Sequence, residues 1–309
     1  MTCSEWFETW LNRHKQGIKE STAEKHRYNL QRINERIGDI PLKNLTPYHI
    51  QNMYEDLLDD GLSENTVHST GTTLELAMKQ ACKEKLLKDN PCDETQKPSR
   101  KKKEVRFLTR DEVNRLLEEV KGEWPYECFY SLAIGTGMRR GELLGLRWGD
   151  IDQENMKLRV VRQIKKVNGW NFEFDELKTK WSRRTIRINS DTMQVLKRHR
   201  KKQLELKLQS QKWDHDDLVF TDRDGKHLKP SYWKKHLKRS LDKAGCKEVT
   251  LHELRHTCAT LLLDSGRHPK VVKEVLGHRD IKTTLDTYSH VLPDQQKQAA
   301  EDLGKIISV

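Results

Sequence analysis

The stretch HELRHTCATLLLDSG holds the residues of this chain whose spacing most directly suggests chemistry. His252 and His256 are one helical turn apart, and with Glu253 they match the H-E-x-x-H pattern of zinc proteases. Zinc needs a third protein ligand, and the Gly and His of the extended protease pattern are missing here, although a distant residue such as Glu274 could serve. Arg255 shares the His252 face and would place a fixed cation beside a metal. The pattern therefore favours an anion over zinc.

A helix is expected to carry these residues. Thr250 and Glu253 form a T-x-x-E capping box, which predicts a helix start and gives Glu253 a structural task as a cap. At about 100° per residue, His252 and Arg255 share one face. The leucines and Cys258 on the opposite face are expected to form core.

Three other stretches carry residue types suited to phosphate. A glycine-flanked pair, Arg139 and Arg140, precedes an amphipathic helix in GTGMRRGELLGLRW. Lysines lie near the turn of a β-hairpin predicted for LKTKWSRRTIRI. His278 is followed ten residues later by Tyr288 in LGHRDIKTTLDTYSH. Arginine donates two parallel hydrogen bonds to a phosphate and stays charged, and histidine can give or take a proton near neutral pH.

Charge and composition narrow the class of protein. The 309 residues have a net charge of +11 and a pI of about 9.2. Residues 1–90 hold 12 Lys and Arg against 14 Asp and Glu, whereas the rest holds 46 against 33. The excess of basic residues in this larger part of the chain suggests that it binds a polyanion such as nucleic acid. The six cysteines form no C-x-x-C pair and no apolar run reaches the length of a membrane span, which predicts a cytoplasmic protein without membrane attachment.

The hydrophobic pattern predicts a mainly α fold with a small β-sheet. Residues 1–91 read as a four-helix bundle, 92–104 as a basic linker, and 105–309 as a mixed α/β domain with a C-terminal tail helix. Predicted helix starts are the caps at Ser21, Thr46, Ser63 and Thr109. Strands are predicted near 156–164, 172–177 and 184–188, and later helices near 190–208, 231–244, 251–264, 269–276, 280–289 and 294–303.

Taken in order, these motifs resemble the tyrosine recombinase family, which includes the phage integrases. The family pattern is an Arg, a hairpin Lys, H-x-x-R, L-G-H and a Tyr, and all five elements are present in this order. The resemblance covers nearly the whole chain, because the helical bundle also looks like the family's core-binding domain. The hairpin sequence and the ten-residue spacing from His278 to Tyr288 look most like integrases of phages or conjugative transposons.

The resemblance implies a role for each matched residue. Tyr288 would be the nucleophile that forms a 3′-phosphotyrosine, and Arg139 and Arg255 would clamp the phosphate. His252 and His278 would donate hydrogen bonds and move protons. Lys178, or alternatively Lys180, would protonate the leaving 5′ oxygen. No metal or cofactor is implied. Basic residues expected to contact DNA are Arg100, Lys101, Lys102, Lys103, Arg140, Lys180, Arg183 and Arg184.

The implied partner is double-stranded DNA, at attachment sites or transposon ends. The family also implies a tetramer on DNA, joined through the C-terminal tail, and leaves room for an accessory excision factor. The expected activity is site-specific recombination through a Holliday junction, for integration or excision of a mobile element. The alternatives are a chromosome-dimer-resolving recombinase, a type IB topoisomerase, a non-catalytic DNA-binding protein and a zinc protease.

Overall fold

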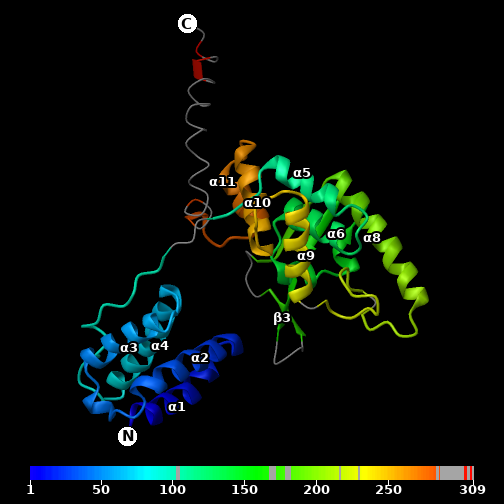
Figure 1. The fold of residues 1–309 in the computed structure, drawn as a ribbon. Coiled ribbons are helices and arrows are strands. Elements are labelled where there is room, and N and C mark those ends of the chain that lie inside the picture. Colours follow the sequence, from blue (N-terminus) through cyan, green and yellow to red (C-terminus); the bar gives the residue numbers. More distant parts are fainter. Residues whose placement is uncertain are drawn as a thin grey trace. The chain divides into compact units, whose positions relative to one another are not determined.

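The computed structural model describes residues 1–101, 105–166, 172–177, 182–215, 217–228, 230–282, 285, 303–304 and 307. The chain folds as two compact units, the N-terminal unit of residues 1–103 and the C-terminal unit of residues 104–309. Both are shown in Figure 1, and each is described by itself. The expectation of a mainly α fold with a small sheet is confirmed. Within the described residues, no helix combines the length and apolar character needed to cross a membrane.

The N-terminal unit is built from helices around one core. Its elements are α1 (Cys3–His14), η1 (Lys15–Gly17), α2 (Glu20–Ile37), η2 (Leu42–Asn44), α3 (Pro47–Asp59) and α4 (Glu64–Lys83). Thr46 and Ser63 cap α3 and α4 as predicted. The cap predicted at Ser21 is wrong, because α2 already begins at Glu20 and its N-cap, Lys19, makes no side-chain bond.

The segment predicted to be a linker lies along α4 as far as the structure describes it. Lys97 Nζ pairs with Glu75 at 2.6 Å, and the Pro98 carbonyl is 2.8 Å from His68 Nδ1. Asn65 Nδ2 donates to the Lys101 carbonyl at 3.3 Å. Residues 92–101 are therefore held on the N-terminal unit by both side-chain and backbone contacts.

The C-terminal unit surrounds one buried helix. Its helices are α5 (Arg110–Glu119), α6 (Tyr126–Thr136), α7 (Arg140–Leu144), η3 (Trp148–Asp150), α8 (Ser190–Gln209), α9 (Pro230–Lys243), α10 (Leu251–Asp264) and α11 (Pro269–Leu276). The helix α6 was not predicted from the sequence, because its own apolar residues occupy nearly all of its faces and leave no helical period. It packs against α8 and α10. A stack of Phe129 on Trp233, with ring centroids 3.8 Å apart, fixes α6 to α9.

Two small antiparallel sheets cover part of this unit. One has the order β1 (Ile151–Asp152), β2 (Lys157–Val160), β5 (Arg184–Arg187), and the other pairs β3 (Arg162–Lys166) with β4 (Phe172–Glu176). The predicted hairpin over residues 177–188 is therefore wrong in its pairing. The strands before and after residues 178–181 belong to different sheets, and those four residues lie outside the described part.

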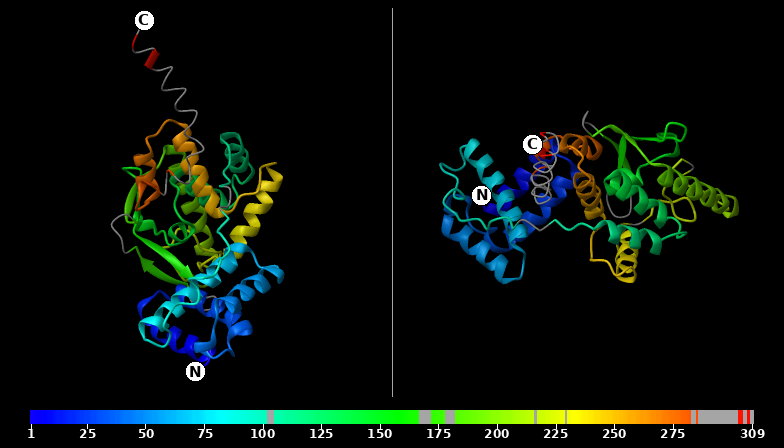
Figure 2. Two further views of the ribbon diagram at one scale, coloured as in Figure 1. Left: turned by 90° about the vertical axis from the view of Figure 1, so that its left-hand side faces the viewer. Right: turned by 90° about the horizontal axis from the view of Figure 1, so that it is seen from above.

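A second, smaller core holds α11 on α10. It consists of Ala259, Leu263, Val272 and Leu276, and Figure 2 shows the two helices beside each other. This packing places the C-terminal end of α11 near the turn that follows α6, where several of the predicted site residues lie.

Candidate active site

Four predicted site residues lie at or near the ends of three helices. Arg139 is the N-cap residue of α7, His252 and Arg255 belong to the first turns of α10, and His278 directly follows Gly277 at the end of α11. Both arginines act electrostatically on the pKa values of both histidines. The fold thus brings together residues that are up to 139 positions apart in the sequence.

The turn before Arg139 depends on a glycine. Gly137 ends α6 with φ of +61°, in the left-handed region that favours glycine. A Cβ on Gly137 would lie 2.6 Å from Leu276 Cδ2 and 3.2 Å from Cys258 Sγ. This position therefore admits only glycine, both for its backbone conformation and for the close approach of α10 and α11.

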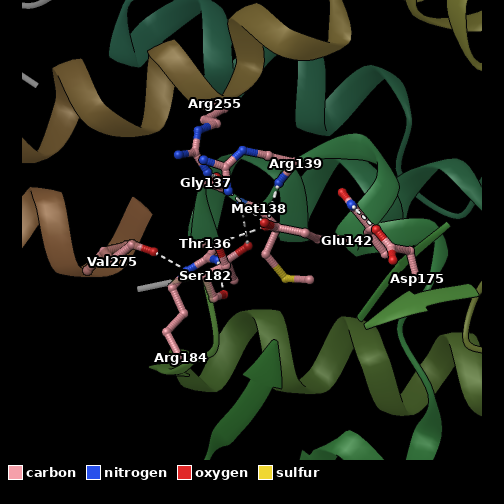
Figure 3. A network of polar contacts seen from close by, with 11 residues as sticks. Thr136, Gly137, Met138, Arg139, Glu142, Asp175, Ser182, Arg184, Arg255 and Val275 are labelled. Atoms are coloured by element: carbon pink, nitrogen blue, oxygen red, sulfur yellow. Dashed lines mark hydrogen bonds and ion pairs between the residues drawn. The ribbon is translucent and has the colours of Figure 1, made fainter. Parts of the chain in front are cut away.

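A buried carboxylate, Glu142, holds Arg139 in place. Its Oε1 accepts from Arg139 Nη1 at 2.7 Å, and its Oε2 accepts from the Arg139 backbone N–H at 2.9 Å. Arg184 Nη2 donates to the same Oε2 at 2.9 Å (Figure 3). Burial acts to raise the pKa of Glu142, but Arg184 and Arg139 outweigh burial and keep the pKa below its ordinary value. Glu142 is therefore an anion between two arginines.

Arg184 was expected to contact DNA, but the structure gives its side chain other partners. The side chain is 7% exposed. Besides its bond to Glu142, its Nε donates to the Val275 carbonyl at 2.6 Å and its Nη1 to the Ser182 carbonyl at 3.4 Å. Its neighbour Arg183 is half-exposed and bonds to the Leu177 carbonyl and to Glu176. Arg184 thus faces the protein interior.

Arg255 is also buried, with 2% of its surface exposed. Its Nη1 donates to the Gly137 carbonyl at 2.7 Å, which ties α10 to the turn after α6 (Figure 3). The opposite face of α10 was expected to be core, but Arg255 and Ala259, on the His252 face, are buried as well. The reason is that α6 and α11 both pack on α10.

Burial and neighbouring charges lower the pKa of each histidine in this region, which favours the neutral form. Burial lowers the pKa of His252, and Arg255 and Arg139 lower it further. Burial, followed by Arg255 and Arg139, lowers the pKa of His278 to about 4. The His256 ring makes a T-shaped contact with His252 at 4.9 Å between centroids, and burial lowers the pKa of His256 to about 4. A region this rich in positive charge suits an anion.

Glu253 serves as a helix cap, as predicted. Its carboxylate accepts from the Thr250 backbone N–H at 2.6 Å, and the Thr250 hydroxyl accepts from the Glu253 N–H at 3.3 Å. In the part of the chain that the structure describes, no three His, Cys, Asp or Glu residues are grouped to hold a metal ion.

An open pocket of about 410 Å³ lies beside Arg139 and His252. Its lining includes Arg140, which is exposed, and Gln163 and Phe172 from the β3–β4 sheet, which are half-buried. Arg100 and Lys101 are exposed on the N-terminal unit, where Lys101 Nζ pairs with Glu64 at 2.8 Å. The predicted residues Lys102, Lys103, Lys178, Lys180 and Tyr288 lie outside the described part.

Sequence reasoning missed Glu142 and the buried position of Arg184. The spacing contained a signal for Glu142, because an acidic residue three positions after Arg139 stands where a carboxylate caps a helix start. The sequence contained no comparable signal for Arg184. Arg183 and Arg184 are adjacent residues of the same type, and only the fold separates them.

Known protein families and relatives match most of the chain. Residues 106–295 match the Phage integrase family, and residues 2–58 match the N-terminal SAM-like domain of phage integrases. The chain is 34% identical over 291 residues to a "Tyrosine recombinase XerC-like" protein of Caldanaerobacter subterraneus, covering 88% of this chain and 74% of the relative. It is 30% identical over 281 residues to the ICEBs1 integrase of Bacillus subtilis, covering 89% and 76%.

Solved structures share the fold. The Tn1549 transposon integrase in complex with a circular intermediate DNA superposes with a TM-score of 0.83 at 24% identity, over 98% of this chain and 99% of that one. A lambda integrase tetramer bound to a Holliday junction gives a TM-score of 0.69 at 19% identity, over 93% of this chain and 77% of that one.

Proposed function

We propose that this chain, which belongs to the phage integrase family of tyrosine recombinases and is a site-specific DNA recombinase, cleaves DNA by attack of the Tyr288 hydroxyl on a phosphodiester held by Arg139 and Arg255. The observation that carries the proposal is the convergence of these two arginines with His252 and His278 at three helix ends. We infer that one phosphate lies against these four side chains.

The arginines supply the fixed positive charge that phosphoryl transfer requires. Negative charge develops on the non-bridging oxygens as Tyr288 attacks, and donors fixed beforehand stabilise it without reorganisation. Arg139 is fixed by Glu142, and Arg255 by the Gly137 carbonyl. The new bond joins the tyrosine oxygen to phosphorus at the 3′ end, and the bond from phosphorus to the 5′ oxygen breaks.

Proton transfer completes the step. The Tyr288 hydroxyl, with an ordinary pKa near 10, must lose its proton, and in our proposal His252 assists this transfer. His278 donates a hydrogen bond to a phosphate oxygen. The leaving 5′ oxygen takes a proton from Lys178, with Lys180 as the alternative donor. Rejoining to a second strand reverses the same steps and leads through a Holliday junction.

The substrate we propose is double-stranded DNA at the joined or separate ends of a mobile element, acted on in the cytoplasm. The names of relatives support it, since they include the ICEBs1 integrase and the integrase of Staphylococcus phage L54a. We extend to this chain the tetrameric state seen for lambda integrase on a Holliday junction. The C-terminal tail would join the subunits, an accessory factor would direct excision, and the N-terminal unit would share the binding of DNA.

A nicked suicide substrate tests the proposal. DNA spanning the joined ends of the element, nicked close to the cleavage site, should trap a covalent protein–DNA complex that survives denaturing electrophoresis. Tyr288→Phe should abolish the complex, and EDTA should leave it unchanged. Tyr232→Phe is the control, because Tyr232 is an exposed tyrosine on α9. A complex that persists in Tyr288→Phe would refute the nucleophile, and loss with EDTA would require a metal.

A further inference from the structure

We propose that Arg184 is a positioning residue of the recombination reaction, which keeps Arg139 available to the phosphate and fixes the turn that carries His278. The inference rests on the proposed function of this site. Its starting point is that the Arg184 side chain, 7% exposed to solvent, joins three segments of the C-terminal unit. These are α7 through Glu142, the end of α11 through Val275, and the start of β5, where Arg184 itself lies.

The first part of the role is electrostatic. Glu142 is fully buried, and its carboxylate accepts hydrogen bonds from both Arg139 and Arg184. One negative charge shared by two arginines leaves a net charge of about +1 for this group. Without Arg184, the same carboxylate would neutralise Arg139 and hold its guanidinium more strongly. Arg184 therefore offsets the charge of the residue that orients Arg139, so that orientation does not remove positive charge from the site.

The second part of the role is to hold the end of α11. The last carbonyls of a helix have no partner within the helix and carry partial negative charge, so a cation there is stabilising. Arg184 Nε donates to one of them, the Val275 carbonyl, at 2.6 Å. Two residues later the chain turns at Gly277 with φ of +69°, and the His278 N–H donates to the Lys273 carbonyl at 3.1 Å. Arg184 thus anchors the turn from which His278 projects.

Arg184 also lies close in the sequence to the two candidate lysines. Arg184 begins β5, which pairs with β2 in the three-stranded sheet. In the sequence it comes four residues after Lys180 and six after Lys178. One side chain therefore connects the segments that supply Arg139 and His278 to the strand that follows the two candidate lysines. The hydrogen bonds described above for its neighbour Arg183 go to Glu176 and to the Leu177 carbonyl, and none of them reaches α7 or α11.

The experiment measures single-turnover formation of the covalent complex at saturating suicide DNA, with Kd for the same DNA measured separately. Arg184→Met should slow complex formation by about 100-fold and change Kd by less than about 3-fold. Arg184→Lys should lose less, because it keeps the charge but not the three-way bonding. The double variant E142Q/R184M should react at least about 10-fold faster than Arg184→Met, because the unbalanced carboxylate is gone. Arg187→Met, on the same strand and exposed, is the matched control and should react as the wild type.

All variants are compared at a temperature where circular dichroism shows each to be folded, so that lost stability is not read as lost chemistry. A rate for Arg184→Met equal to that of the wild type would overturn the inference, as would a double variant no faster than Arg184→Met. A merely structural Arg184 would lower folded content and DNA affinity together. If the wild type itself forms no covalent complex, the proposed function fails and the inference fails with it.

Discussion

The C-terminal unit contains two clusters built from similar side chains that differ in charge and in exposure. The first, the arginine cluster, consists of Arg139, Glu142, Arg184, Arg255, His252 and His278. The second, the Tyr130 cluster, consists of Glu123, Tyr126, Tyr130, His236 and Ser240. Both join distant segments of the chain through buried hydrogen bonds. The arginine cluster borders the open pocket lined by Arg139 and His252, whereas Tyr130 and His236 of the second cluster are buried.

The Tyr130 cluster contains the residue types of a catalytic relay, but Tyr130 and His236 are buried. The Tyr130 hydroxyl lies 3.1 Å from His236 Nδ1, and His236 Nε2 lies 2.8 Å from Glu123 Oε2. The Tyr126 ring stacks on His236 with centroids 3.3 Å apart. Burial raises the pKa of Tyr130 well above its ordinary value, and Tyr126 and Glu123 raise it further. This tyrosine is held protonated and cannot meet a substrate.

The arginine cluster has the opposite balance. Its described members include three arginines but a single carboxylate, that of Glu142. A tyrosine, a histidine and an acid in hydrogen-bond contact therefore do not by themselves make an active site. A surplus of cations and access from solvent distinguish the cluster that can receive a phosphate from the one that holds helices together.

Arg139→Lys should have the largest effect, and it tests the arginine cluster. Lysine keeps the charge and can still pair with Glu142, but it lacks the planar fork that donates two parallel bonds to phosphate. Covalent-complex formation on suicide DNA should fall by about 10²–10³-fold, while the urea midpoint of unfolding changes little. A rate within a few fold of the wild type would show that Arg139 is not a clamp.

His236→Phe tests the Tyr130 cluster and should give the reverse pattern. Phenylalanine can keep the stack on Tyr126 but leaves the buried Tyr130 hydroxyl without its partner, so unfolding free energy should fall by about 1–3 kcal/mol. Urea denaturation of the full chain measures this. At a temperature where the variant is folded, the rate of covalent-complex formation should match the wild type. A large loss of rate in the folded variant would remove the distinction between the clusters.

DNA binding should change the protonation of His278 in the arginine cluster and leave that of His236 in the Tyr130 cluster unchanged. Burial and the neighbouring arginines lower the pKa of His278 to about 4, so the free protein has it neutral at pH 6. A bound phosphate favours the charged form and should raise this pKa by about 1 unit or more, which is about 1.4 kcal/mol. Because binding then takes up a proton, DNA affinity should increase as the pH falls from about 6 towards 4.

His236 is the internal reference for that titration. Burial lowers its pKa, and the hydrogen bond to Glu123 opposes burial without reversing the shift. Its contribution to stability is therefore present above the unfolded pKa near 6.5 and is lost as the pH falls. Nitrogen-15 NMR of labelled histidines should show DNA moving the titration of His278 and leaving that of His236 in place. Equal shifts, or none, would contradict the assignment of the phosphate to the arginine cluster.

Local chemistry explains what the sequence could predict. The caps at Thr46, Ser63, Thr109 and Thr250 each depend on residues within one helical turn, and the structure has all four. The motif order also led to the family. These features require no knowledge of which segments meet in space.

The parts that sequence reasoning missed depend on distant contacts. The helix α6 has no amphipathic period because it is buried on nearly all sides. The strands β4 and β5 looked like one hairpin, yet each pairs with an earlier strand instead. The neighbours Arg183 and Arg184 are the same residue type, and only the fold leaves the Arg183 side chain half-exposed and places that of Arg184 against Glu142.

Arg140→Gln should have the smallest effect and makes the comparison sharpest, because Arg140 is adjacent to Arg139. Arg140 is exposed and lines the open pocket, whereas Arg139 is held by Glu142. Removing one phosphate-contacting cation should weaken DNA binding several-fold and reduce the slope of log K against log salt by about 1. At saturating DNA, the rate of covalent-complex formation should not change, because Arg140 is not expected to touch the reacting phosphate. A fall in that saturated rate similar to that of Arg139→Lys would extend the clamp to Arg140, whereas an unchanged salt slope would remove Arg140 from the DNA-binding surface.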